Sequence, residues 1–210
     1  VDSGTVVMML DTLVNIDGID CAAVDCESEA TTVMDHLCQL GHTTIALLTA
    51  RDADPPTHWT NQIDPDCERL SHALLREKQR RTLNASQAYH ATLTYDRARS
   101  DALLRVAIDR LWRMTPAPTA IICFHPHLAI QARDALRDRG LDCPAQVSIV
   151  TRDMHRPHAD FTTLASDPAR MGRVAAEHMY NRLTDPSSAA TRLLFRSTLS
   201  HDTTTGPSPR

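Results

Sequence analysis

The chain has 210 residues, of which 42% are apolar and 23% charged, and its net charge is −4. These values are typical of a globular protein that buries a substantial core, and no apolar run approaches the about 20 residues of a membrane helix, which excludes an integral membrane protein. A protein that binds nucleic acid through its own surface usually carries a basic stripe, whereas the densest basic stretch here, 76–81, is short and is typical of a solvated helix end.

Strand and helix signals alternate through the first half of the chain. Short apolar runs bounded by turn residues predict strands, and apolar residues every three or four positions predict helices with one buried face. In chain order these are strands at 6–10 and 21–24, a helix that closes at 36–40, a strand at 44–49, a polar loop at 52–66, a helix at 66–79 and a weaker strand at 89–93. Gly41 stands where a helix commonly ends in a left-handed residue.

The same alternation continues in the second half. The sequence predicts a helix at 97–114, a strand at 119–124, a helix at 127–139, a strand at 147–150, a helix at 170–183 and a last strand within 193–199. Thr, Ser, Pro and Gly dominate from 203 onward and predict a disordered tail. Strands that alternate with helices indicate an α/β fold with a parallel sheet.

The six cysteines include no Cys-x-x-Cys pair. Their even number permits disulfides, but a chain of this size does not need them to be stable. Cys38 and Cys123 lie within apolar helix and strand patterns, which favours buried free thiols. We therefore expect a reducing compartment, the cytoplasm.

No catalytic or cofactor motif is apparent. The chain lacks a Gly-rich phosphate loop, a Gly-x-Ser-x-Gly elbow and a His-Glu-x-x-His helix, so we predict neither an enzyme nor a cofactor. The pairs His125/His127 and His155/His158 could present imidazoles to zinc if their loops converged. No Cys or Glu stands at ligand spacing beside them, so exposed loop histidines are the preferred interpretation and no metal site is predicted.

Five segments carry a resemblance to a known family. The first is VDCESEATTVMDHLCQLGHTTIALL at 24–48, with VD at a strand end followed by HLxxLGH and IA. The others are PTAIIC at 118–123, the helix and turn at 129–144, QVSIVTRD at 146–153, and FTTL with MGRVAA at 161–176. In this order and spacing the set resembles the effector domain of the lactose-repressor (LacI/GalR) family.

The resemblance implies a periplasmic-binding-protein-like fold of type I, with two α/β lobes of parallel sheets flanked by helices, three crossovers between the lobes, and a small effector in the cleft. On this mapping 1–27 is a remnant of the N-terminal lobe and 28–160 is a nearly complete C-terminal lobe. A crossover and returning helix at 161–188, a final strand region at 189–202 and the tail at 203–210 follow. The first lobe would then be truncated, with its opening strands and the DNA-binding headpiece expected before Val1. A lobe that lacks its first strands exposes apolar surface, so we expect poor solubility or a covering second chain.

The resemblance also suggests where an effector would bind. Asp11 and Asp153 match strand-end carboxylates that contact ligands in the family, and the alternative for each is a carboxylate that caps a loop. His125 replaces a ligand-binding Asn and could still hydrogen-bond an effector, although an ordinary loop histidine is the preferred interpretation. Arg69 lies one turn beyond Asp66, which occupies the position of a family Arg. Such departures permit a ligand other than a neutral sugar, or a pocket that has lost its function.

The function implied by the resemblance is that of the effector-binding and dimerisation part of a DNA-binding transcriptional regulator. Its partners would be a small molecule, possibly a carbohydrate, a second copy of the chain, and operator DNA through a headpiece that this sequence does not contain. The alternative is a periplasmic sugar-binding protein of an ABC transporter, which shares the fold. The sequence upstream would discriminate between them, because one requires a helix-turn-helix and the other a signal peptide.

Overall fold

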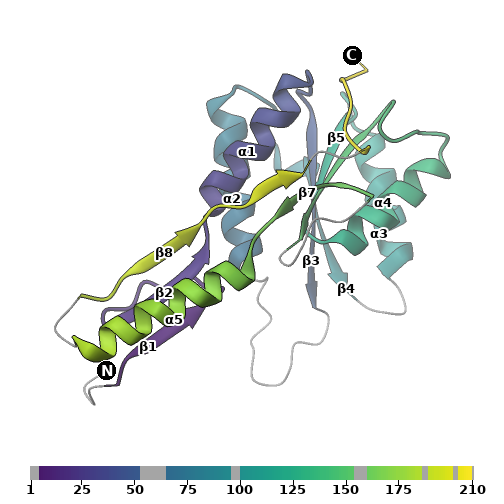
Figure 1. Ribbon diagram of the computed structural model, residues 1–210. Helices are drawn as coiled ribbons and strands as arrows, with labels where there is room; N and C mark the ends of the chain where they lie inside the picture. Colours follow the sequence, from purple (N-terminus) through teal and green to yellow (C-terminus); the bar gives the residue numbers. More distant parts are fainter. Residues whose placement is uncertain are drawn as a thin grey trace.

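The computed structural model describes residues 5–52, 65–95, 100–153, 160–185, 189–200 and 203–209, and within them the strands form two sheets (Figure 1). The smaller sheet has the order β1-β2-β8 and the larger one the order β4-β3-β5-β6-β7-β9. All pairs are parallel except β7 with β9. The predicted α/β class with parallel sheets is therefore confirmed.

The elements have the following bounds. The strands are β1 (Val7–Leu10), β2 (Ile19–Val24), β3 (Ile45–Asp52), β4 (His90–Tyr95), β5 (Ala120–Cys123), β6 (Ser148–Asp153), β7 (Thr162–Ala165), β8 (Arg192–Phe195) and β9 (Thr198–Ser200). The helices are α1 (Cys26–Gln39), α2 (Pro65–Arg80), α3 (Ser100–Trp112), α4 (Pro126–Arg137) and α5 (Pro168–Thr184), with a 3-10 turn at Gln87–Tyr89. Most of the polar loop predicted at 52–66 lies outside the described residues.

Helices cover both faces of the six-stranded sheet. On one face, α1 and α2 pack through side chains such as Val33, Leu37 and Leu70. On the other, α3 and α4 pack through side chains such as Ile108 and Leu136. All five side chains are fully buried, so the apolar patterns of the sequence correspond to real cores.

The helix ends follow from local chemistry. Asp25 caps α1, because its Oδ1 accepts a hydrogen bond from the Ser28 N–H at 3.0 Å, and Asp167 caps α5 in the same way through the Arg170 N–H at 2.8 Å. Gly41 follows α1 with a φ of 85°, the left-handed conformation predicted for it.

Among the described residues, one helix covers the three-stranded sheet: α5, which packs on β1 and β2. The buried core there is small and consists of Ala22, Val24, Met171 and Ala175. No helix of the described ranges is both long enough and apolar enough to cross a membrane.

The chain passes between the two sheets three times: from β2 into α1, from β7 into α5, and from β8 into β9. The last passage explains why the single strand predicted within 193–199 is two strands. β8 pairs with β2 in the small sheet, whereas β9 pairs with β7 in the large one. β7 itself was not predicted as a strand.

The prediction of a disordered tail is wrong for residues 203–209. Thr204 is buried; its carbonyl accepts a hydrogen bond from the Ile149 N–H at 2.7 Å, and its hydroxyl accepts one from the Thr162 N–H at 2.9 Å. The buried His42 ring lies 3.0 Å from the Gly206 carbonyl oxygen. Hydrogen bonds rather than apolar burial hold this segment, and a composition-based prediction does not detect them.

All six cysteines are free, including Cys38 and Cys123, for which the sequence favours buried free thiols. Cys123 is fully buried, while Cys38 is only partly so.

Candidate functional site

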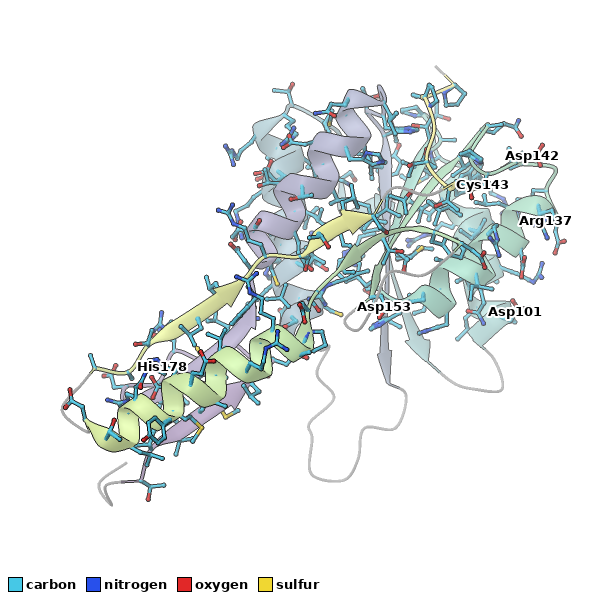
Figure 2. The ribbon with its side chains drawn as sticks, viewed as in Figure 1. Asp101, Arg137, Asp142, Cys143, Asp153 and His178 are labelled. Atoms are coloured by element: carbon cyan, nitrogen blue, oxygen red, sulfur yellow. The ribbon has the colours of Figure 1, made fainter. Side chains whose placement is uncertain are left out.

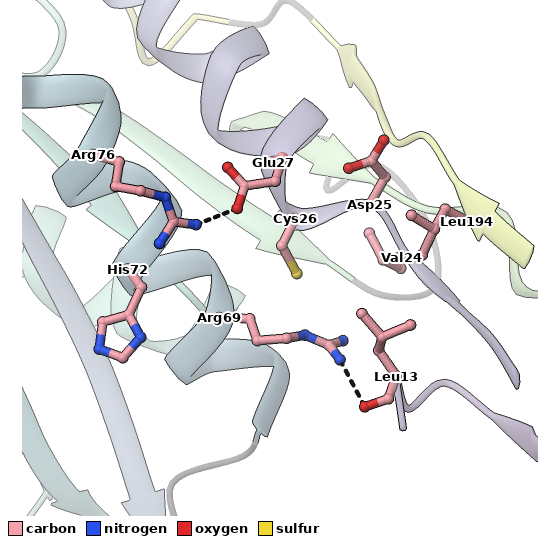
Figure 3. A pocket seen from close by; sticks show the side chains of 9 residues that line it. All are labelled: Leu13, Val24, Asp25, Cys26, Glu27, Arg69, His72, Arg76 and Leu194. Atoms are coloured by element: carbon pink, nitrogen blue, oxygen red, sulfur yellow. Dashed lines mark hydrogen bonds and ion pairs between the residues drawn. The ribbon is translucent and has the colours of Figure 1, made fainter. Parts of the chain in front are cut away.

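A pocket of about 230 Å³ lies where the layers of the two sheets meet (Figure 3). Residues from the three-stranded part, from the start of α1 and from α2 contribute to its wall. They are Leu13, Val24, Asp25, Cys26, Glu27, Arg69, His72, Arg76 and Leu194. Because both parts of the molecule line it, a ligand here would contact both at once.

One wall of the pocket is basic. Arg69, His72 and Arg76 are three, four and seven positions apart on α2, which places them on one face of that helix. The Arg69 guanidinium donates from Nη1 to the Leu13 carbonyl at 3.1 Å and forms an ion pair with Asp66. Arg69 therefore links α2 to the loop that follows β1.

The opposite wall is the start of α1. Arg76 forms an ion pair with Glu27, and both side chains are more than half exposed. The Cys26 thiol donates to the Asp66 carbonyl at 3.8 Å. Burial raises the pKa of Cys26 to about 11, although the charge of Arg152 acts in the opposite direction, so the thiol stays protonated at neutral pH.

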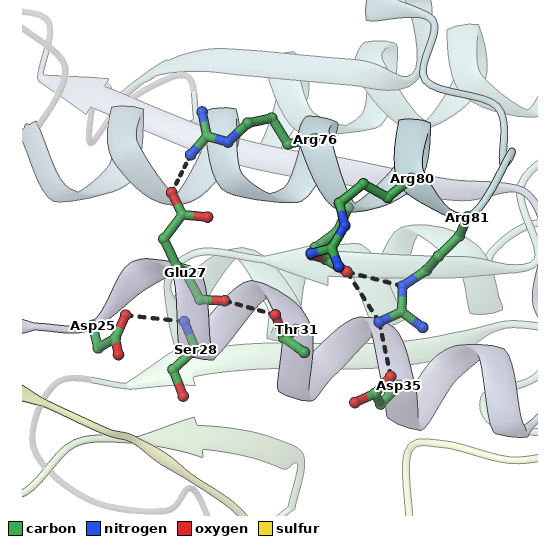
Figure 4. A network of polar contacts seen from close by, with 9 residues as sticks. Asp25, Glu27, Ser28, Thr31, Asp35, Arg76, Arg80 and Arg81 are labelled. Carbon is green, nitrogen blue, oxygen red and sulfur yellow. Dashed lines mark hydrogen bonds and ion pairs between the residues drawn. The ribbon is translucent and has the colours of Figure 1, made fainter.

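A polar network fixes the two helices that form these walls (Figure 4). Toward the far end of α1, Arg81 donates to Asp35 at 2.8 Å and to Glu77 at 3.0 Å. Together with the ion pair of Arg76 and Glu27, these contacts tie α2 to α1 at both ends of their contact.

A buried ion pair involves Glu29, which lies three residues after Cys26 on α1. The Arg152 Nε donates to the Glu29 Oε2 at 2.9 Å, and the two side chains are 2% and 1% exposed. The Ser197 hydroxyl donates to the other oxygen of Glu29. Burial lowers the pKa of Arg152, but the adjacent Glu29 carboxylate outweighs this effect and keeps the guanidinium charged. The pair thus joins the end of β6, the start of α1 and the passage from β8 to β9.

Arg69 is the only one of the four predicted ligand residues that lines this pocket. His125 does not line the pocket. It stands at the N-cap position of α4, its Nε2 is 3.9 Å from the Cys67 sulfur on α2, and its ring stacks on that of His127.

The two predicted aspartates lie at strand ends, as the sequence suggested. Asp11 is exposed after β1, with a φ of 58° and its N–H donating to the Ala22 carbonyl at 2.8 Å. Asp153 is the half-buried last residue of β6 (Figure 2). Neither lines the pocket, and whether they bind a ligand stays a prediction.

Sequence reasoning missed His72 and Arg76 as site residues. Their helical spacing from Arg69 is the signal that could have identified them, whereas the local sequence around Arg76 indicates only a solvated basic helix end. As for metals, the described residues contain no cluster of three potential ligands, and the pair His155/His158, which could present imidazoles to zinc but is not predicted as a metal site, lies outside them.

Comparison with known proteins identifies a family and a fold that this chain shares. A family model described as a periplasmic binding protein-like domain matches residues 34–201. The HTH-type transcriptional repressor PurR of Aliivibrio salmonicida is 24% identical over 155 residues. That match covers 71% of this chain but only 42% of the repressor, so the chain spans less than half of this relative's length.

Solved structures share the fold. A LacI transcriptional regulator from a Rhodococcus species matches with a TM-score of 0.73 and 24% identity, and a PurR family regulator from Vibrio parahaemolyticus with 0.74 and 20%; each match covers 96% of this chain and 70% of the other. The transcriptional regulator CelR, solved in complex with cellobiose, matches with a TM-score of 0.71 and 16% identity over 94% of this chain and 58% of that one.

Proposed function

Because the chain belongs to the family of periplasmic binding protein-like domains, we propose that it is the effector-binding part of a LacI-type transcriptional regulator. The observation that carries the proposal is the pocket between the two sheets, whose wall is shared by Leu13, Leu194 and the basic face of α2. The fold shared with LacI-type regulators supports the same assignment.

The proposed mechanism is a population shift. A ligand that contacts both sheets favours the arrangement in which its contacts are made, and it changes the equilibrium only by its difference in affinity between two arrangements. The contact from Arg69 to the Leu13 carbonyl already spans the two parts, so a ligand that competes for this guanidinium would act directly on their relative position.

Asp153, Asp11 and His125 are proposed to complete the effector site. Carboxylates and imidazoles at strand ends are groups that orient a small polar ligand above an apolar surface. The protein would act as a homodimer in the cytoplasm, would reach operator DNA through a separate headpiece, and would catalyse no reaction. A sugar-like effector is proposed from the family alone.

The test is a thermal-shift screen of the full-length protein against sugars, sugar phosphates and nucleosides. A ligand at 100 times its Kd stabilises by about 2.7 kcal/mol, which raises the Tm by roughly 5–10 °C for a chain of this size. Asp153→Ala should reduce the shift, whereas Asp101→Ala, an exposed carboxylate on α3, should leave it unchanged.

The active ligand is then added to the full-length protein bound to a fluorescent operator fragment. A change in anisotropy supports a regulator. Ligand binding by a protein that has no affinity for DNA would instead favour the periplasmic sugar-binding alternative.

A further inference from the structure

We propose that the effector of this chain carries an anionic oxygen group, a phosphate ester or a carboxylate, and that Arg69, His72 and Arg76 bind it. This inference rests on the proposed function, because it names the ligand class of the same interlobe site. It commits to a charged ligand, whereas the family resemblance alone leaves neutral sugars open.

The first reason is the balance of donors and acceptors at the pocket. One oxygen of each nearby carboxylate is engaged by the protein: the Asp25 Oδ1 caps α1, the Glu27 Oε1 pairs with Arg76 and the Asp66 Oδ1 pairs with Arg69. A guanidinium has five N–H donors, of which Arg69 commits one to Leu13 and one to Asp66. The wall therefore offers a ligand mainly N–H donors, which suits an acceptor-rich, negatively charged group.

The second reason is that an anion can displace the existing partners at low cost. The side chains of Glu27 and Arg76 are 67% and 53% exposed, and a solvated pair of this kind contributes little to stability. A ligand anion can thus replace Glu27 at Arg76. Arg69 is only 25% exposed, so its attraction to an anion is screened less by water.

The remaining wall limits the rest of the ligand. Leu13, Val24 and Leu194 form an apolar surface facing the basic one, which suits a carbon skeleton. The volume of about 230 Å³ is below the roughly 300 Å³ at which sites for drug-sized ligands begin. The pocket therefore fits a small molecule with one anionic end and one apolar face.

The experiment is calorimetric titration of the full-length protein with four probes: glucose 6-phosphate, gluconate, glucose and inorganic phosphate. We expect glucose 6-phosphate or gluconate to bind at least 10-fold more tightly than glucose, with an affinity that falls as salt rises. A preference between these two probes distinguishes a phosphate from a carboxylate ligand. Titration with inorganic phosphate measures the affinity of the anion subsite without the rest of the ligand.

Variants locate the binding. Arg69→Met should weaken the anionic probe about 10-fold to 100-fold, and Arg76→Met, at a half-exposed side chain, about 3-fold to 10-fold with little effect on folding. Arg105→Met, which removes an exposed arginine on α3 that pairs with Asp101 and Asp138, is the matched control and should bind as the wild type does.

The outcomes separate this inference from the proposed function. Glucose that binds as tightly as glucose 6-phosphate would overturn the anionic class and leave an effector sensor. Anion binding that is unchanged in both Arg69→Met and Arg76→Met would overturn the site. If no compound of either class bound, and the screen for the proposed function were also negative, the proposed function itself would fail.

Discussion

The two sheets of this chain differ in how they are stabilised. The six-stranded sheet has a helical layer and an apolar core on each face. In the part of the chain that the structure describes, the three-stranded sheet has one helix and a core cluster of four buried residues. Apolar side chains are exposed on its strands and on α5, namely Met9, Leu10, Leu194, Tyr180 and Leu183.

A buried carboxylate adds polar contacts that stabilise the small sheet, whose apolar core is small. Asp20 on β2 is fully buried and accepts hydrogen bonds from His178 at 3.0 Å, Arg182 at 3.1 Å and the Thr191 N–H at 2.6 Å. These contacts join β2 to α5 and to the segment before β8. The comparison indicates that apolar burial stabilises the large sheet, whereas a polar centre is important for the small one.

The largest effect is expected at the buried ion pair between Glu29 and Arg152. Glu29→Ala leaves the Arg152 guanidinium buried and uncompensated, which should cost about 4 kcal/mol in the free energy of unfolding. Urea denaturation measures this cost. The double variant Glu29→Met with Arg152→Met should recover most of it, and a double variant as unstable as the single one would contradict the role of the uncompensated charge.

A matched pair of methionines tests the difference between the cores. Met34→Ala, in the large core under α1, should cost about 3 kcal/mol, because densely packed neighbours cannot fill the cavity. Met171→Ala, in the four-residue core, should cost about half as much. Both costs come from urea denaturation, and equal values would show that the small sheet is packed as firmly as the large one.

The Asp20 centre makes the small sheet sensitive to acid. Burial alone would raise the pKa of Asp20, but hydrogen bonds from Thr191, His178 and Arg182 hold it below the usual value near 3.8. Since the folded pKa is the lower one, the stabilisation is present above about pH 4 and is lost as pH falls through the folded pKa. Asp20→Asn should cost about 2 kcal/mol at pH 7, because hydrogen bonds to a charged group are lost.

The pH dependence of the stability difference is the control for this prediction. In urea denaturation from pH 7 to pH 2.5, the difference between wild type and Asp20→Asn should shrink below pH 4. A difference that stayed constant over this range would contradict a contribution from the ionised carboxylate.

The smallest effect concerns the C-terminal segment. Thr204→Val keeps the shape of the buried side chain but removes the hydroxyl that bonds Thr162 N–H and the Ile149 carbonyl, at a cost of about 1 kcal/mol. Hydrogen exchange at Ile149 and Thr162 should accelerate, with no change at α3. Unchanged exchange at both positions would mean that the segment contributes nothing to the sheet.

The sequence predicts those helices and strands in which the spacing of apolar residues corresponds to a buried face. The helices and most of the strands were predicted because their apolar spacing matches one buried face. The sequence does not predict β7, because two of its four residues are Thr. Threonine is a polar residue type, yet both of these side chains are fully buried. The division between β8 and β9 depends on which neighbouring strand each one pairs with. This is a property of the topology and not of the local sequence.

The site was predictable to a smaller extent. The family resemblance pointed to Arg69, which lines the pocket, and helical spacing could have added His72 and Arg76. The ion pair between Glu29 and Arg152 joins residues 123 positions apart, and no pattern in either segment indicates it. Long-range pairings of this kind require the fold.

The central claim is that one small ligand contacts both parts of the molecule. Hydrogen–deuterium exchange of the full-length protein, with and without the compound that gives the largest thermal shift, tests it most directly. We predict that protection increases at 11–14 and 66–76 together, with little change at α3. Protection confined to one of these two segments, or to neither, would contradict binding between the two sheets.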